Sequence, residues 1–197
     1  MKPFLSLLLL VVAVMTAYPA YAHQPIMKLD GTGNETSPFV IEEPEISKAI
    51  FKELEGNPHY YTLSSETEFS FYAGITKAKL ENCAVGQTFS FDVLDAEGNR
   101  LFFADGENFE WWAWYEEFGK NWYWVGPEIG ENFKSNRTLP AGTYTIKIYN
   151  KNNSGQYSLA VGDIEHFPIG VIARTAFLMP KIERQFWKNA SCTNASS

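Results

Sequence analysis

From residue 59 onward, apolar and polar side chains alternate along several short segments, and this alternation constrains the fold more than any other feature. A period of two is typical of strands that bury one face. No helical pattern stands between these segments, which disfavours a parallel α/β fold. The pattern predicts a mostly β protein built as an antiparallel β-sandwich. The alternating segments are residues 60–63, 69–75, 89–93, 100–104, 144–148 and 157–161.

A short amphipathic helix is predicted over residues 44–55, before the first alternating segment. Ile46, Ile50 and Leu54 fall four positions apart, which places them on one face of a helix. Pro44 suits the first helical turn, where its missing N–H removes no hydrogen bond. We therefore expect one N-terminal helix packed on the sheet.

The C-terminal segment, residues 164–188, is predicted to be helical as well. Within it, residues 169–188 combine an apolar first half, interrupted only by Arg174, with a basic second half, and Pro180 is expected to break the helix. Two interpretations stay open: the helix closes one end of the sandwich, or it lies on a membrane surface or docks on a partner. In the second interpretation the side chains near the headgroups are Arg174, Lys181, Arg184 and Lys188.

Residues 1–22 have the three features of a secretory signal peptide. Lys2 gives a positive start, residues 4–14 are apolar, and Ala20–Ala22 form a small-x-small cleavage site. The apolar run is too short to span a bilayer. We expect a secreted or periplasmic chain that starts at His23. Losing Lys2 leaves 15 basic and 23 acidic residues, a net charge of −8, and this acidity argues against a nucleic-acid partner.

The exported chain is expected to form a single domain. Its predicted parts are an extended lead-in over 23–42, a β-sandwich over 43–163, the helical segment 164–188 and a flexible tail over 189–197. Its cysteines, Cys83 and Cys192, could pair in an oxidising compartment. The sequence does not show whether their Cα atoms lie close enough, so a disulfide and two free thiols both stay open.

Two segments near the end of the predicted sandwich resemble a known hairpin. Residues 140–144 read Pro-Ala-Gly-Thr-Tyr, and residues 155–161 read Gly-x-Tyr-x-Leu-x-Val. This resembles the closing hairpin of bacterial prepeptidase C-terminal (PPC) domains, accessory β-sandwiches attached to secreted peptidases, and the whole chain is similar in order to small exported bacterial proteins. The resemblance implies a jelly-roll-like binding or stabilising module, often with calcium in its loops. An aromatic-rich insert over 108–130 departs from that pattern.

The aromatic insert is the first candidate binding site. Its rings could fill the core, because large aromatic side chains dominate core burial. They could also form a platform for a saccharide or protein partner, because exposed apolar patches are rare unless used. Both interpretations hold if alternate side chains of the insert point to opposite faces of the sheet. The tryptophans concerned are Trp111, Trp112, Trp114, Trp122 and Trp124.

Two kinds of metal site are also considered. Calcium binds carboxylate and amide oxygens, although the same residues are good turn formers. Copper could be held by the amine and imidazole of His23 with His59 or His166, in a copper carrier or oxidative enzyme; the alternative is ordinary surface or core histidines. The calcium candidates are Asp105, Glu107, Asn108 and Glu110, and the turn Asp95, Glu97 and Asn99.

No catalytic constellation is found in the sequence. Gly-x-Ser-x-Gly and phosphate-binding glycine loops are absent. Glu116 and Glu117 are adjacent on a predicted strand and would point to opposite faces, so they would not act on one bond. The sequence therefore favours a non-catalytic binding or structural module. The copper protein and an envelope protein that docks on a membrane through its C-terminal helix stay as alternatives.

Overall fold

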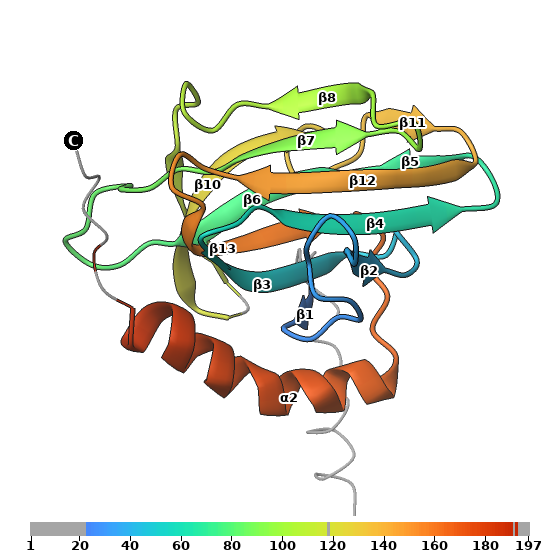
Figure 1. Cartoon of the computed structure of the whole chain (residues 1–197). Coiled ribbons are helices and arrows are strands. Elements are labelled where there is room, and N and C mark those ends of the chain that lie inside the picture. The colour runs from blue at the N-terminus through green and yellow to red at the C-terminus, as the bar shows by residue number, and fades with distance from the viewer. Residues whose placement is uncertain (1–22, 118, 191, 193–197) are drawn as a thin grey trace, which may run out of the picture.

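The computed structural model describes residues 23–117, 119–190 and 192. The predicted signal peptide, residues 1–22, and most of the predicted tail lie outside the described residues. The described chain is mostly β, as predicted, with three sheets and one C-terminal helix (Figure 1). The predicted lead-in carries two short strands joined by a polar loop.

Two large sheets and one small sheet contain all the described strands. The six-stranded sheet has the order β1 (Gln24–Ile26), β3 (Lys48–Glu55), β13 (Ser154–Val161), β6 (Ala73–Ala78), β10 (Asn121–Ile129) and β9 (Trp112–Glu116). The five-stranded sheet has the order β2 (Phe39–Ile41), β4 (His59–Ser65), β12 (Gly142–Tyr149), β7 (Ser90–Leu94) and β8 (Arg100–Ala104). The two-stranded sheet pairs β11 (Arg137–Leu139) with β5 (Phe69–Phe71).

Strand pairing is antiparallel apart from two parallel pairs near the N-terminus. These are β1 with β3 and β2 with β4, in which each lead-in strand adds to the edge of a large sheet. The sheet orders by themselves do not show the jelly-roll connectivity that the resemblance implies.

The two large sheets pack face to face around the main core. Ile50 on β3 and Leu159 on β13 meet Phe91 on β7 and Ile146 on β12, and all four are fully buried. Burying a side chain of this size contributes about 1.5–3 kcal/mol. The alternating segments found in the sequence supply these residues, so the predicted sandwich is confirmed.

The helix α2 (Ile169–Glu183) lies across the outer face of the six-stranded sheet (Figure 1). It continues into a short π-helical turn, η1 (Arg184–Lys188). Ile182 and Phe186 pack on Phe51 and Tyr123 of the sheet and form a second, smaller core. The predicted C-terminal helix is confirmed.

Pro180 lies inside α2, so the prediction that it breaks the helix is wrong. Proline removes one backbone donor and leaves one carbonyl without its helical partner. Pro180 and Ala176 are both exposed, so water can reach that carbonyl. The helix therefore continues for another turn at modest cost.

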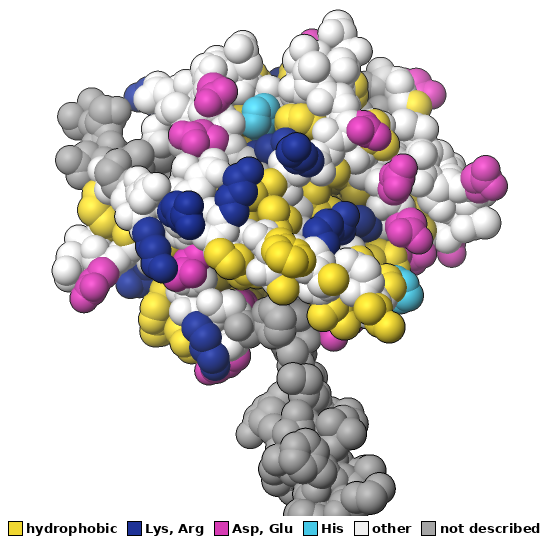
Figure 2. Space-filling model, turned by 90° about the horizontal axis from the view of Figure 1, so that it is seen from below, with side chains coloured by type: hydrophobic (Ala, Val, Ile, Leu, Met, Phe, Trp, Pro, Cys, Tyr) yellow, Lys and Arg dark blue, Asp and Glu magenta, His cyan; other side chains and the backbone are white. Residues whose placement is uncertain are grey.

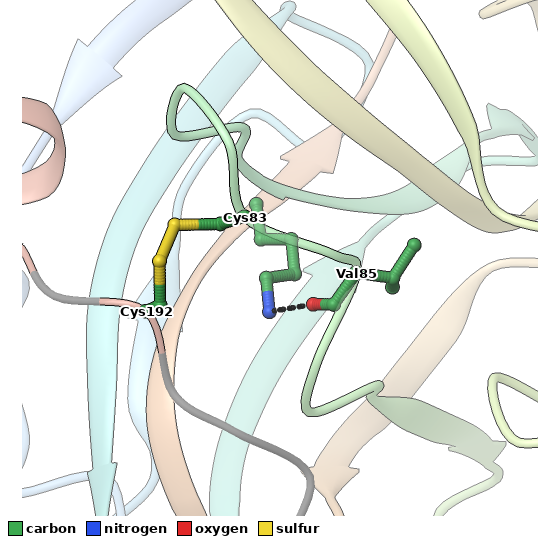
Figure 3. Close-up of a disulfide and its surroundings, with 4 residues drawn as sticks. Cys83, Val85 and Cys192 are labelled. Atoms are coloured by element: carbon green, nitrogen blue, oxygen red, sulfur yellow. Dashed lines mark hydrogen bonds between the residues drawn. A yellow bond between two sulfur atoms is a disulfide. The ribbon is translucent and has the colours of Figure 1, made fainter.

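The two cysteines, whose pairing the sequence left open, form a disulfide (Figure 3). The Cα atoms of Cys83 and Cys192 are 5.6 Å apart, across 109 positions of sequence. Beside them, the Lys77 ammonium donates a hydrogen bond of 2.7 Å to the Val85 carbonyl (Figure 3). The bridge ties the chain just after η1 to the loop that follows β6.

The predicted helix over 44–55 is wrong, because residues 48–55 form strand β3. Positions four apart share a face in a strand as well as in a helix, so the spacing of Ile50 and Leu54 fits both. Phe51 points to the opposite face, where it joins the second core. Pairing of β3 with β13 along its whole length decides between the two structures.

Candidate functional site

The aromatic insert folds as an antiparallel pair of strands, β9 and β10. Trp112 lies opposite Val125, Trp114 opposite Tyr123, and Tyr115 opposite Trp122. Successive side chains of a strand point to opposite faces, so this register divides the rings between two sides of the sheet. Trp112 and Trp114 therefore face one side of the pair, and Tyr115, Trp122 and Trp124 face the other.

Trp111 is a structural residue of the main core. It is 8% exposed, and its indole Nε1–H donates a hydrogen bond of 2.8 Å to the Gly106 carbonyl. Its ring lies so close to Gly126 that a Cβ there would be 2.4 Å from the indole. The structure therefore removes Trp111 from the predicted binding residues.

Trp114 lies on the side of the sheet that α2 covers. Its ring centroid is 5.9 Å from that of Tyr123, which in turn is 4.9 Å from Trp187. The Trp187 Nε1–H donates a hydrogen bond of 2.9 Å to the Trp122 carbonyl. These rings join the helix to the sheet.

Trp122 and Trp124 lie on the opposite side of the hairpin, together with Tyr115. Trp122 is 48% exposed and packs 5.2 Å from Tyr115. The Lys79 ammonium lies 5.6 Å from the Trp122 ring and 5.3 Å from the Trp124 ring. The ammonium therefore makes cation–π contacts with both tryptophans, and Trp122 stays about half exposed.

An aromatic groove is formed where Trp112 meets two phenylalanines of the preceding segment. Trp112, Phe103 and Phe109 are 44%, 45% and 37% exposed and line one open groove of about 470 Å³. Its volume lies within the usual range for small-molecule sites. The same groove is lined by the polar side chains of Asp105, Asn108, Glu128 and Glu131.

The carboxylate of Glu128 is held in position at the groove. The Tyr72 hydroxyl donates to its Oε2 at 2.9 Å, and the Phe133 backbone N–H donates to the same atom at 3.1 Å. Burial, and then the charge of Glu128, raise the pKa of Tyr72 well above its ordinary value. The phenol therefore stays protonated and keeps donating.

The carboxylate of Asp105, which also lines the groove, is held by a local turn. The Asn108 side-chain amide donates to Asp105 at 2.8 Å, and the backbone N–H groups of Glu107 and Asn108 donate at 3.0 and 3.2 Å. These hydrogen bonds, led by that of the Asn108 side chain, lower the pKa of Asp105. Asp105 is therefore a fixed anion.

This geometry suits a ligand with apolar faces and hydroxyl groups. Exposed aromatic faces can stack against the apolar C–H face of a sugar ring, and ionised carboxylates accept hydrogen bonds from hydroxyls. Of the predicted ligand-binding tryptophans, the structure places only Trp112 in this groove. Sequence reasoning missed Phe103, whose alternation with the partly buried Phe102 was the available signal.

Two of the predicted calcium residues, Asp95 and Asp105, accept hydrogen bonds within local turns. Asp95 accepts hydrogen bonds from the backbone of Glu97 and Asn99 and from the Asn99 amide, much as Asp105 does. Glu107 and Glu110 are exposed. Over residues 23–117, 119–190 and 192, no three His, Cys, Asp or Glu side chains gather as metal ligands.

The histidines differ in their hydrogen-bond partners. His23 Nδ1 contacts the Ser47 hydroxyl, and His59 Nδ1 lies 2.6 Å from the Tyr157 hydroxyl. His166 contributes its backbone carbonyl, which accepts from the Gln24 side chain. Burial, with Lys134 or Lys52 respectively, lowers the pKa of both His23 and His59 to about 4. The copper site therefore stays a prediction.

Comparison with known proteins gives a weak structural likeness. No protein-family model matches the chain, and no curated protein sequence matches it. Among solved structures, the pre-peptidase C-terminal domain of a collagenase from Bacillus anthracis matches with a TM-score of 0.37 and 11% identity. The match covers 62% of this chain and 90% of that domain. At this level of similarity it supports no argument about function.

None of the helices in the described part of the chain is long and apolar enough to cross a bilayer.

Proposed function

We propose that this chain is an exported, non-catalytic binding module that holds a saccharide in its aromatic groove. The observation that carries the proposal is the convergence of Trp112, Phe103 and Phe109 with the carboxylates of Asp105 and Glu128 in one open groove. Monomeric proteins seldom expose aromatic side chains together unless the patch is used.

Export is supported by two independent features. The first 22 residues have the basic, apolar and small-residue regions of a signal peptide. The Cys83–Cys192 disulfide suits an oxidising compartment, where such bonds persist.

The experiment compares two tryptophans of similar exposure. Trp112→Ala removes the ring from the groove, whereas Trp122→Ala removes an equally exposed ring outside it. Binding is measured by isothermal titration calorimetry against soluble chito-oligosaccharides, laminarin, xylan and peptidoglycan fragments. We expect Trp112→Ala to weaken binding about tenfold or more, about 1.4 kcal/mol, and Trp122→Ala to leave it unchanged.

Three results would contradict the proposal. They are no binding by any member of the panel, equal weakening by both variants, and unchanged binding by Trp112→Ala. Repeating the titration with calcium and then with a chelator tests whether the Asp105 turn holds an ion as part of the same site.

A further inference from the structure

The outer side of α2 exposes large apolar side chains that belong to neither of the two cores formed by the described residues. Ile169 and Phe177 are 86% and 85% exposed, and Ile172 is 56% exposed. The inward side is fixed by the buried Ile182 and by Phe186 of η1, so the helix cannot turn its outer side inward without losing the second core. This exposure is therefore built into the packing of the helix.

The exposed residues form a continuous apolar surface on the helix. At 3.6 residues per turn, Ala173, Ala176 and Pro180 fall on the same side as Ile169, and all of them are exposed. The first turn of the helix contains no acidic residue. Such an apolar surface is suited to a low-dielectric environment.

The charge of this region is opposite to that of the whole chain. Residues 169–188 contain four basic residues and one acid, Glu183, whose carboxylate pairs with Lys188 at 3.1 Å. The whole chain, in contrast, has a net charge of −7. Viewed from this side, apolar side chains lie among several Lys and Arg side chains (Figure 2). The basic residues of the helical region are Arg174, Lys181, Arg184 and Lys188.

The length of the helix favours contact along a surface. Fifteen residues span about 22 Å, less than the roughly 30 Å of a bilayer core. Cationic amphipathic helices of this kind lie in the plane of a membrane interface with their apolar side in the acyl region. A second copy of the chain is a poorer occupant, because two such basic surfaces would face each other and repel.

We propose that α2 and η1 dock this protein on an anionic lipid surface. Ile169, Ile172 and Phe177 enter the boundary between headgroups and acyl chains, while Arg174, Lys181 and Arg184 contact the lipid phosphates. This site lies on the outer face of the six-stranded sheet and shares no residue with the aromatic groove. The proposal therefore does not depend on the proposed saccharide site.

The test uses the chain from His23 to Ser197, which contains every described strand and helix. It is sedimented with vesicles of equal phosphatidylglycerol and phosphatidylcholine, and with vesicles of phosphatidylcholine alone. We expect binding to the anionic vesicles that weakens as salt is added, and at least tenfold weaker binding to the neutral ones.

Two variants divide the apolar and electrostatic contributions. The double variant that carries Ile169→Gln and Phe177→Gln should bind anionic vesicles at least tenfold more weakly. The variant Lys181→Gln should bind them about fivefold more weakly, and its binding should depend less steeply on salt. Leu101→Gln is the matched control, since Leu101 is an exposed apolar residue on β8. It should bind as the original chain does. All these positions are exposed, so unchanged thermal midpoints should show that the fold is retained.

Three outcomes would overturn the proposal. The first is no sedimentation of the original chain with anionic vesicles. The second is equal binding by the Ile169→Gln, Phe177→Gln variant. The third is a dimer in analytical ultracentrifugation that this variant converts to a monomer, which would assign the surface to a second copy of the chain.

Discussion

The two faces of the six-stranded sheet are covered in different ways. The inner face meets a whole second sheet, and the core that they share contains 22 buried apolar residues among those the structure describes. The outer face meets one helix and has a second core of only four. The inner layer therefore supplies most of the stability, whereas the outer layer leaves the apolar side of α2 available for another partner.

The largest expected effect comes from removing a phenylalanine ring from each core. Phe91→Ala in the main core should lower the free energy of unfolding by about 4–5 kcal/mol, and Phe186→Ala by about 3 kcal/mol, because α2 can settle into the space. Phe177→Ala, on the exposed side, should change it by less than about 0.5 kcal/mol. Urea unfolding measures all three. A larger loss at Phe186 than at Phe91 would contradict the comparison.

The disulfide is expected to matter mainly for the outer layer. Replacing both Cys83 and Cys192 by Ser should lower the free energy of unfolding by about 2–5 kcal/mol, since the bridge closes a loop of more than 100 residues. In this variant the outer layer around Trp187 should open before the main core does. This opening would be measured as faster amide hydrogen exchange along η1 than along β13. Uniformly faster exchange in both would argue that the two layers unfold as one unit.

The smallest expected effect is a pH dependence at the edge of the main core. The pKa of His59 is about 4 in the folded protein, against 6.5 in the unfolded chain, because burial and Lys52 disfavour the charged ring. The unfolded chain binds more protons between these values, so stability falls as pH drops from 6.5 toward 4. The slope is a fraction of about 1.4 kcal/mol per pH unit, because the ring is partly exposed.

His59→Gln checks this assignment, because glutamine does not titrate. The variant should show a flatter pH dependence in urea unfolding between pH 7 and pH 5. His23, whose pKa is also lowered to about 4, is the comparison on the other side of the six-stranded sheet. If His23→Gln alone flattens the profile, the pH-sensitive region belongs to the outer layer.

Prediction from the sequence succeeded where the spacing of apolar residues fits a strand and does not fit a helix. The alternating segments at 144–148 and 157–161 became β12 and β13, which lie in the middle of the two large sheets. It failed at 44–55, where the spacing of Ile50 and Leu54 is shared by helix and strand. It also failed at Pro180, because solvent exposure at that point depends on how α2 is oriented.

The candidate site was predicted only in part. The aromatic insert and Asp105 were recognised as unusual, but the groove also needs Phe103 on β8 and Glu128 on β10. These residues come from different sheets, and no local pattern records their approach. The sequence could not assign the five tryptophans of the insert either, since their faces follow from the β9–β10 register.

The sequence alone determined the β-rich class, the C-terminal helix and the acidic balance, because periodicity and composition are local properties. Only the tertiary structure decided that Cys83 pairs with Cys192, that Trp111 is buried while Trp112 is exposed, and that α2 turns an apolar side outward. Each of these depends on contacts between segments far apart in the chain. Such contacts are selected by the packing of whole sheets and not by the residues on either side.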